Sequence, residues 1–192
     1  MADAGDWCPV LPKGPYAASR PNQLWVCDFT YAATWSGFAY TAFITDVHSR
    51  MIVGWRTAES MTADSVTDAL EMAIFSRRRQ LVRGVIAHSD TGSQYTSIAH
   101  TERLGEIGAL ASISSIGDSY DIALAQFVNR LYKTELIRRQ GPWRHAEHVE
   151  LETLAWVDWF NNRQLHSELD DCAPMCRTVS KQRPPTCARQ PR

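Results

Sequence analysis

Apolar residues recur along the first part of the chain in short runs that are typical of β-strands. Residues 24–31 are largely apolar and rich in β-favouring residues, as expected of a buried strand. A turn at Ser36-Gly37 follows, and residues 38–47 and 51–57 predict two further strands. Because short connections join these three segments, we expect them to form an antiparallel meander.

The apolar spacing changes to a helical period at residues 62–79, where Thr62 is a candidate N-cap and Asp64 lies in the first turn. Beyond this helix, strands and helices alternate. The predicted segments are a strand at 85–88, a helix at 98–107, a strand at 110–116 and helices at about 120–139 and 146–161. This order predicts an α/β fold with a mixed five-stranded sheet, three strands antiparallel and then two parallel, and helices on both faces.

Composition supports a single globular domain. The chain has 192 residues, 44% of them apolar, and a formal charge of −1, so no global basic field indicates a nucleic-acid partner. We expect a core domain at 22–167, a flexible lead-in at 1–21 and a basic, proline-containing, disordered tail at 168–192. The sequence shows neither a membrane span nor a signal peptide, so we expect a cytoplasmic protein with no membrane partner.

The cysteines and histidines offer a weak alternative. An odd, scattered set of cysteines in a chain without an export signal does not indicate a disulfide framework. Cys172-x-x-x-Cys176 and His145-x-x-His148 could each supply a pair of metal ligands. Both pairs lie among loop-like or exposed polar residues, so free thiols and surface histidines are a better interpretation than a zinc site.

Two aspartates lie at positions where a charged side chain is unexpected unless it has a partner or a function. Asp28 lies in an otherwise apolar strand, so it either finds a partner or binds a cation. Asp90 ends the strand at 85–88, at a sheet edge where sites gather in α/β folds. Taken alone, each could be a turn or capping residue. Taken together, they suit two-metal phosphoryl transfer, in which carboxylates hold two Mg²⁺ ions ~3.5–4 Å apart.

Five ordered blocks carry the most specific pattern. They are Trp-Val-Cys-Asp-Phe-Thr-Tyr at 25–31, His-Ser-Asp-Thr-Gly-Ser-Gln-Tyr at 88–95, Gly-Asp-Ser-Tyr-Asp-Ile-Ala-Leu-Ala-Gln at 117–126, Leu-Tyr-Lys-Thr-Glu-Leu at 131–136 and Trp-Phe-Asn-Asn-Arg-Gln-Leu-His-Ser at 159–167. Over roughly residues 20–175 the chain resembles the integrase catalytic core of bacterial insertion-sequence transposases, relatives of retroviral integrases. The resemblance implies an RNase H-like fold, Mg²⁺ or Mn²⁺ held by Asp28 and Asp90, and DNA strand transfer.

The sequence departs from this family at the third acid. The family pattern is Asp, Asp and Glu with 35 residues between the last two, and Gln126 stands at that distance from Asp90. Ile122 also replaces the Asn that the family usually carries. A neutral amide binds a cation more weakly than a carboxylate does, so we expect a catalytic site of Asp28, Asp90 and Gln126 with weakened metal binding. Glu135 would lie about 180° away on an α-helix and does not replace the missing acid.

The helix at 120–139 also offers candidate DNA contacts. Asn129, Arg130 and Lys133 follow Gln126 at spacings that place them on its face, where basic and amide groups suit phosphate oxygens. An ordinary solvated helix face is the alternative. For the three arginines at 77–79, a favourable interaction with the helix dipole and solvation are better explanations than DNA contact.

The ends of the sequence suggest a shortened or frame-shifted copy. Residues 1–21 are too few for the DNA-recognition region expected before such a core, and the tail after Pro174 lacks the family's acidic and aromatic run. We expect the element ends and target DNA as partners, in a homo-oligomer or a mixed assembly with full-length transposase. Two alternatives stay open: a non-catalytic DNA-binding or oligomerising remnant, and an RNase H-type nuclease.

Overall fold

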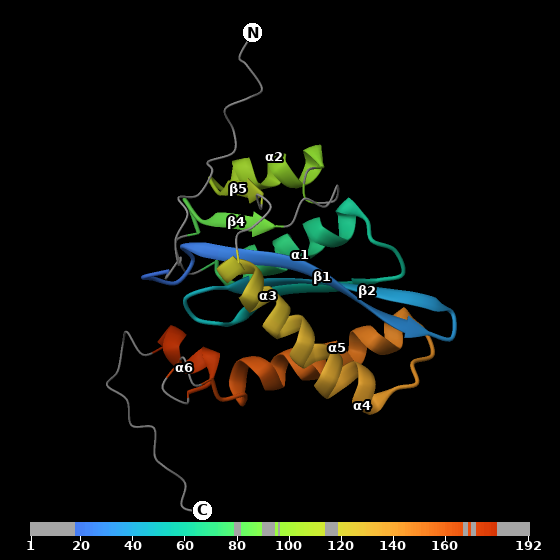
Figure 1. Cartoon of the computed structure of the whole chain (residues 1–192). Coiled ribbons are helices and arrows are strands. Elements are labelled where there is room, and N and C mark those ends of the chain that lie inside the picture. The colour runs from blue at the N-terminus through green and yellow to red at the C-terminus, as the bar shows by residue number, and fades with distance from the viewer. Residues whose placement is uncertain are drawn as a thin grey trace, which may run out of the picture.

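The chain folds around one five-stranded sheet in a computed structural model (Figure 1). The structure describes residues 18–78, 82–89, 95, 97–113, 119–166, 169 and 172–179. The strands are β1 (Leu24–Thr34), β2 (Gly37–Asp46), β3 (Ile52–Ala58), β4 (Ile86–Ser89) and β5 (Leu110–Ile113). The helices are α1 (Ala63–Ser76), α2 (Ile98–Glu106), α3 (Ser119–Tyr132), a π-helical segment (Lys133–Ile137), α4 (Arg138–Gln140), α5 (Ala146–Asn162) and α6 (Pro174–Val179).

The strands follow the order β3-β2-β1-β4-β5 across the sheet. The first three strands pair antiparallel, whereas β4 pairs parallel with β1 on one side and with β5 on the other. This arrangement confirms the mixed sheet predicted from the sequence. The consequence for the site is that β1, β4 and β5 run in the same direction, so β4 and β5 end beside the point where β1 leaves its ladder with β4.

Helices cover both faces of the sheet, with α1 and α2 on one side and α3 and α5 on the other (Figure 1). Alternate residues of β1 supply both cores, because successive side chains of a strand point to opposite faces. The core under α3 and α5 includes Leu24, Val26, Phe43, Trp55, Val128, Tyr132, Leu136, Trp156 and Phe160. The core under α1 and α2 includes Trp25, Cys27, Ala42, Ile44, Val53, Val66, Leu70, Ala87 and Leu104.

Helix α1 begins where the sequence predicts. Thr62 is its N-cap, and the Thr62 hydroxyl accepts a hydrogen bond from the Ser65 backbone N–H at 3.4 Å. The helix packs closely on β3 because Gly54 has no side chain: a Cβ at that position would overlap the backbone oxygen of Ala69. This close approach fixes α1 against the edge strand.

The end of α1 corrects an expectation. Arg77 was expected to be solvated at the helix end, but it is only 2% exposed. Its guanidinium Nη2 donates to Asp46 Oδ2 at 3.1 Å and to Ser49 Oγ at 3.0 Å. The arginine is buried because a fully buried carboxylate at the end of β2 needs a cationic partner. Arg78 is exposed as expected, and residue 79 lies outside the described residues.

The single long helix expected at 120–139 is interrupted in the structure. Helix α3 ends at Tyr132, a π-helical segment follows, and α4 ends at Gln140, just before the predicted break at Gly141-Pro142. Tyr132 is fully buried, and its hydroxyl hydrogen-bonds with those of Thr153 at 2.7 Å and Thr41 at 3.3 Å. The wider helical turn therefore begins directly after the residue that fixes α3 to α5 and β2.

Two further differences concern segment ends. Strand β1 continues three residues beyond the predicted end at Tyr31, because β2 supplies an antiparallel partner up to the turn. Part of the expected disordered tail is helical, since α6 spans Pro174–Val179. Residues 1–17 of the expected lead-in and 180–192 of the expected tail lie outside the described residues. Across the described part of the chain, helices are too short or too polar to span a bilayer.

Candidate functional site

Asp28 stands at the point where the parallel part of the sheet ends. Strand β1 pairs with β4 only through Leu24–Cys27, so Asp28 is the first residue of β1 beyond that ladder. The last pair joins Cys27 to Ser89, the residue before Asp90 in the sequence. Asp90 itself lies outside the described residues, as do residues 91–94. This sheet edge is the place where ligand sites of α/β folds gather.

The carboxylate of Asp28 is half-buried, and each of its oxygens accepts a hydrogen bond. Its Oδ1 accepts from the backbone N–H of Phe29 at 2.8 Å, and its Oδ2 accepts from the side-chain amide of Asn129 at 2.7 Å. The same Asn129 nitrogen lies 3.4 Å from the Phe29 carbonyl oxygen. Asn129 therefore joins α3 to β1 at the site. A carboxylate offers about four lone-pair positions on two hard oxygens, the ligand chemistry that Mg²⁺ prefers.

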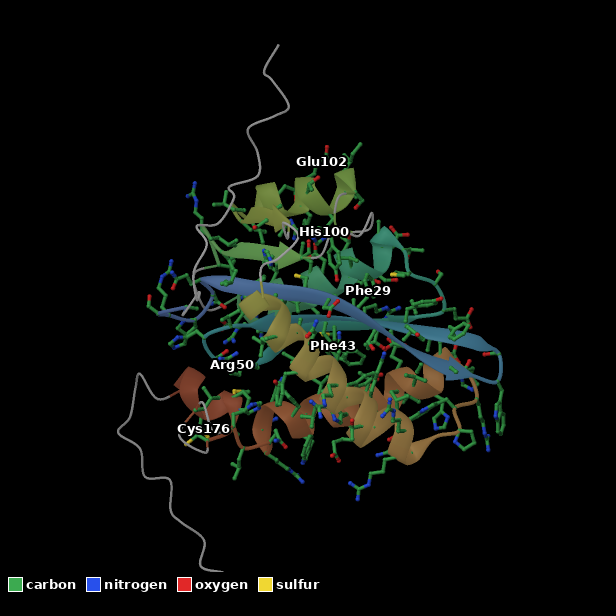
Figure 2. The ribbon with its side chains drawn as sticks, viewed as in Figure 1. Phe29, Phe43, Arg50, His100, Glu102 and Cys176 are labelled. Carbon is green, nitrogen blue, oxygen red and sulfur yellow. The ribbon has the colours of Figure 1, made fainter. Side chains whose placement is uncertain are left out.

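Aromatic side chains flank Asp28 on both faces of the sheet. Phe43 is its ladder partner on β2 and lies in the core under α3, while Phe29 packs toward the opposite face (Figure 2). Burial raises the pKa of the adjacent Cys27 thiol to about 12, and the charge of Asp28 adds to the effect. The thiol is therefore neutral at physiological pH.

Gln126 lies on the same helix, one turn before Asn129. Its side chain is exposed, whereas Leu124 and Val128 on either side of it point into the core. Residues three apart on an α-helix share a face, so Gln126 and Asn129 both belong to the side of α3 that meets Asp28. The structure thus places Gln126 one helical turn before Asn129, the residue that contacts Asp28.

The predicted DNA-contacting residues have three different environments. Asn129 is half-buried and engaged with Asp28, whereas Arg130 is exposed. Lys133 is half-buried, and its ammonium lies 4.7 Å from the ring centroid of Tyr31. Glu135 does not take the place of the missing acid, because its carboxylate pairs with Arg139 at 3.2 Å in the next turn.

The alternative zinc ligands do not converge. His145 is the N-cap of α5, and its Nδ1 accepts from the backbone N–H of His148 at 3.3 Å. Within the described ranges, no group of three or more His, Cys, Asp or Glu side chains could hold a metal ion. Cys172 and Cys176 form no disulfide.

Sequence reasoning missed the contact between Asn129 and Asp28. It placed Asn129 beside Gln126 by helical spacing but assigned it to DNA. A signal was available: a carboxylate in an apolar strand needs a partner, and Asn129 is a donor on the helix that carries the third site position. The sequence does not reveal how closely α3 packs against β1, and this packing decides whether Asn129 reaches Asp28.

Comparison with known proteins supplies the family. Residues 18–119 match the family model of the integrase core domain. A relative from insertion sequence element IS986/IS6110 of Mycobacterium tuberculosis (strain CDC 1551 / Oshkosh) is 52% identical over 168 residues, 86% of this chain and 60% of that protein. The transposase for insertion sequence element IS629 of Shigella sonnei is 53% identical over 159 residues, 83% of this chain and 52% of that protein. The chain therefore spans between about half and three-fifths of these relatives.

A solved structure agrees on the fold. The HTLV-2 integrase catalytic core domain, in complex with magnesium and in a trimeric form, superposes with a TM-score of 0.63 at 14% identity over 83% of this chain and 97% of that one. At this identity the likeness concerns the fold alone, and it confirms the predicted RNase H-like α/β architecture. On the strength of the matched family model, the fold and the related sequences, the chain belongs to the integrase core domain family.

Proposed function

We propose that this chain is the catalytic core of an insertion-sequence transposase, whose chemistry is the metal-dependent joining of a DNA 3′-hydroxyl to a phosphodiester. The observation that carries the proposal is the carboxylate of Asp28, placed on β1 directly after its ladder with β4 ends and held by Asn129 from the helix that bears position 126. The proposal adds that Gln126 leaves this core catalytically impaired.

The donor set suits a hard cation only in part. Asp28 supplies carboxylate oxygens, and Asp90 is proposed as the second ligand. Gln126 supplies an amide oxygen, a neutral donor where the family has an acid. Such a set fits one Mg²⁺ better than two, because each additional ion needs carboxylate charge. When bound, the metal would activate the attacking oxygen and stabilise the leaving one.

The remaining residues position the site and the DNA. Asn129 keeps Asp28 in one rotamer, so the carboxylate needs little rearrangement to accept a cation. Arg130 is exposed one residue further along α3, where its guanidinium can bind phosphate oxygens. Lys133 adds a second positive charge beyond the end of α3. DNA is accordingly the proposed partner, bound through local basic side chains and not through a net positive charge of the whole chain.

Replacing Gln126 with Glu tests the proposal. A duplex with a free 3′-hydroxyl is incubated with a labelled target duplex and Mg²⁺ or Mn²⁺, and joined product is measured for the native chain and for Gln126→Glu. We expect the variant to join DNA at least about 10-fold faster, because losing even a residue that only supports a metal ligand costs 10–100-fold.

Two further variants make the result interpretable. Gln140→Glu introduces the same change at an exposed position at the end of α4 and should leave joining unchanged. Asp28→Asn in the Gln126→Glu chain should abolish the gain. If the native chain and all the variants bind DNA but none joins it, the result would instead support the non-catalytic remnant. Cleavage of the RNA strand of an RNA–DNA hybrid would support the nuclease.

A further inference from the structure

Three aromatic side chains gather on the β1–β2 hairpin. Tyr31 and Phe38 are 56% and 50% exposed, and Tyr40 is half-buried. The ring of Tyr31 lies 5.8 Å from that of Phe38 and 6.4 Å from that of Tyr40, and the last two rings are also 6.4 Å apart. We call these three side chains, together with Lys133, the hairpin platform.

The strand register explains why the platform is exposed. Tyr31 pairs with Tyr40, and Ala33 pairs with Phe38, so these side chains share one face of the sheet. That face carries α1, but β3 pairs with β2 only as far as Tyr40, so the outer part of the hairpin continues beyond the third strand. The outer part of the hairpin extends past α1 and α2 (Figure 1). Single exposed apolar side chains are ordinary, whereas a contiguous cluster marks an interaction surface.

The platform carries a positive charge at its edge. Lys133 comes from the segment that follows α3 on the other side of the sheet, yet its ammonium lies over the Tyr31 ring. Beyond Cys27 the outer edge of β1 is no longer paired with β4, which leaves room for this side chain to reach the ring. A cation beside a cluster of exposed aromatic rings matches the needs of a nucleic-acid strand, whose bases can stack on ring faces and whose phosphates are negative.

The platform is also continuous with the proposed site. Tyr31 follows Asp28 by three residues on the same strand, which is about 10 Å at the rise of a β-strand. At the 3.4 Å rise of stacked nucleotides, that span corresponds to about three nucleotides. We infer that the hairpin platform binds unpaired nucleotides of a DNA strand that leaves the site, with bases stacked on Tyr31 and Phe38 and a phosphate beside Lys133. This inference rests on the proposed DNA chemistry at Asp28.

Binding of single-stranded DNA in EDTA tests the platform separately from catalysis. Fluorescence anisotropy of a labelled oligothymidylate of about 12 nucleotides reports the affinity. We expect Tyr31→Leu and Phe38→Leu, which keep apolar area but remove the stacking face, each to weaken binding roughly 5- to 100-fold. Circular dichroism confirms that each variant is folded.

Phe75→Leu is the matched control. Phe75 is 65% exposed and also carries a cation, Arg78, whose guanidinium carbon lies 3.9 Å from the ring centroid, but it sits near the opposite end of the sheet on α1. The Phe75→Leu variant should bind the oligonucleotide with the same affinity as the native chain. Equal affinity in all three variants would overturn the inference. So would unchanged DNA affinity accompanied by weaker self-association in the Tyr31 and Phe38 variants, since that result assigns the platform to a second copy.

The two proposals fail in distinguishable ways. Platform-dependent binding of the oligonucleotide without any gain of joining in Gln126→Glu would support the platform and count against the proposed catalysis. If Gln126→Glu joins DNA faster but oligonucleotide affinity is unchanged in the Tyr31 and Phe38 variants, the proposed catalysis is supported and the platform is refuted.

Discussion

At the scale of single residues, the site depends on how one carboxylate is held. Asp28 lies among apolar neighbours, and its hydrogen bond from Asn129 offsets part of the cost of removing it from water. The amide fixes the direction of the carboxylate without neutralising its charge. Asn129 is therefore a positioning residue for whatever Asp28 binds.

Replacing Asn129 with Leu tests this positioning role. In the Gln126→Glu chain, we expect Asn129→Leu to weaken Mn²⁺ binding by about 10- to 100-fold, because Asp28 loses the donor that orients it. The free energy of unfolding should change by only about 1 kcal/mol. Titration calorimetry with Mn²⁺ and urea unfolding separate the two effects.

A matched amide–carboxylate pair provides the control. Asn162 donates to Asp158 Oδ1 at 2.8 Å on the exposed side of α5, so Asn162→Leu removes the same kind of bond elsewhere. It should leave Mn²⁺ affinity unaltered. A similar loss of affinity in both variants would mean that Asn129 does not act through Asp28.

At the scale of elements, two contacts place the helices that frame the site. Tyr132 joins α3 to α5 and β2 through hydroxyl hydrogen bonds. The pair of Asp46 and Arg77 joins the end of α1 to the turn between β2 and β3. Burial lowers the pKa of Arg77, and the charge of Asp46 acts in the opposite direction, as expected of a buried ion pair.

The buried pair predicts a large loss of stability in Arg77→Met. Removing the guanidinium leaves the fully buried Asp46 carboxylate without its ion-pair partner, which costs about 3–5 kcal/mol. Arg78→Met is the neighbouring control, since Arg78 is exposed and its loss should cost less than about 0.5 kcal/mol. Urea unfolding measures the free energy of unfolding of both variants. Equal losses in the two would show that the buried ion pair of Arg77 and Asp46 does not contribute to stability.

Most elements could be predicted because their apolar periods are local. The strand at 85–88 and the start of α1 at Thr62 needed only a short run or one capping residue. The π-helical segment was not predicted; it directly follows Tyr132, whose hydroxyl partners on β2 and α5 are set by tertiary packing and not by local sequence. Helix α6 was missed since its basic, proline-containing sequence resembles a tail, yet Ala173 and Pro174 are buried.

The candidate site was also only partly predictable, because sequence motifs locate its residues but do not reveal their tertiary contacts. The positions of Asp28 and Gln126 follow from ordered motifs, and the structure places Asp28 in contact with Asn129, one turn after Gln126 on α3. The bond from Asn129 and the exposure of Tyr31 and Phe38 depend on tertiary packing, which sequence spacing does not encode. Asp90 lies outside the described residues, so its role as a ligand stays a prediction.

At the scale of the whole molecule, burial of His100 is expected to contribute to the pH dependence of stability. His100 is 2% exposed and packs against Tyr95 at 5.9 Å between ring centroids. Burial lowers the pKa of His100 from 6.5 to about 4, so between these values the unfolded chain binds a proton that the folded chain does not. Stability is therefore lost as pH falls through this window.

The effect of His100 can be isolated by substitution. From pH 7 to 5, the native chain should lose about 2 kcal/mol of unfolding free energy through this group, at 1.36 kcal/mol per pH unit below 6.5. His100→Phe should show a shallower loss over the same range, as measured by urea unfolding at both pH values. Parallel pH profiles for the two chains would exclude this role of His100.

The central claim is that position 126 and Asp28 serve one cation, and that the amide at 126 limits its binding. A double-mutant cycle in Mn²⁺ affinity tests this most directly, with the native chain, Gln126→Glu, Asp28→Asn and the double variant titrated calorimetrically. We predict that Gln126→Glu binds Mn²⁺ at least about 10-fold more tightly and that the gain disappears when Asp28 is Asn. A gain that persists without Asp28, or no gain at all, would contradict the account.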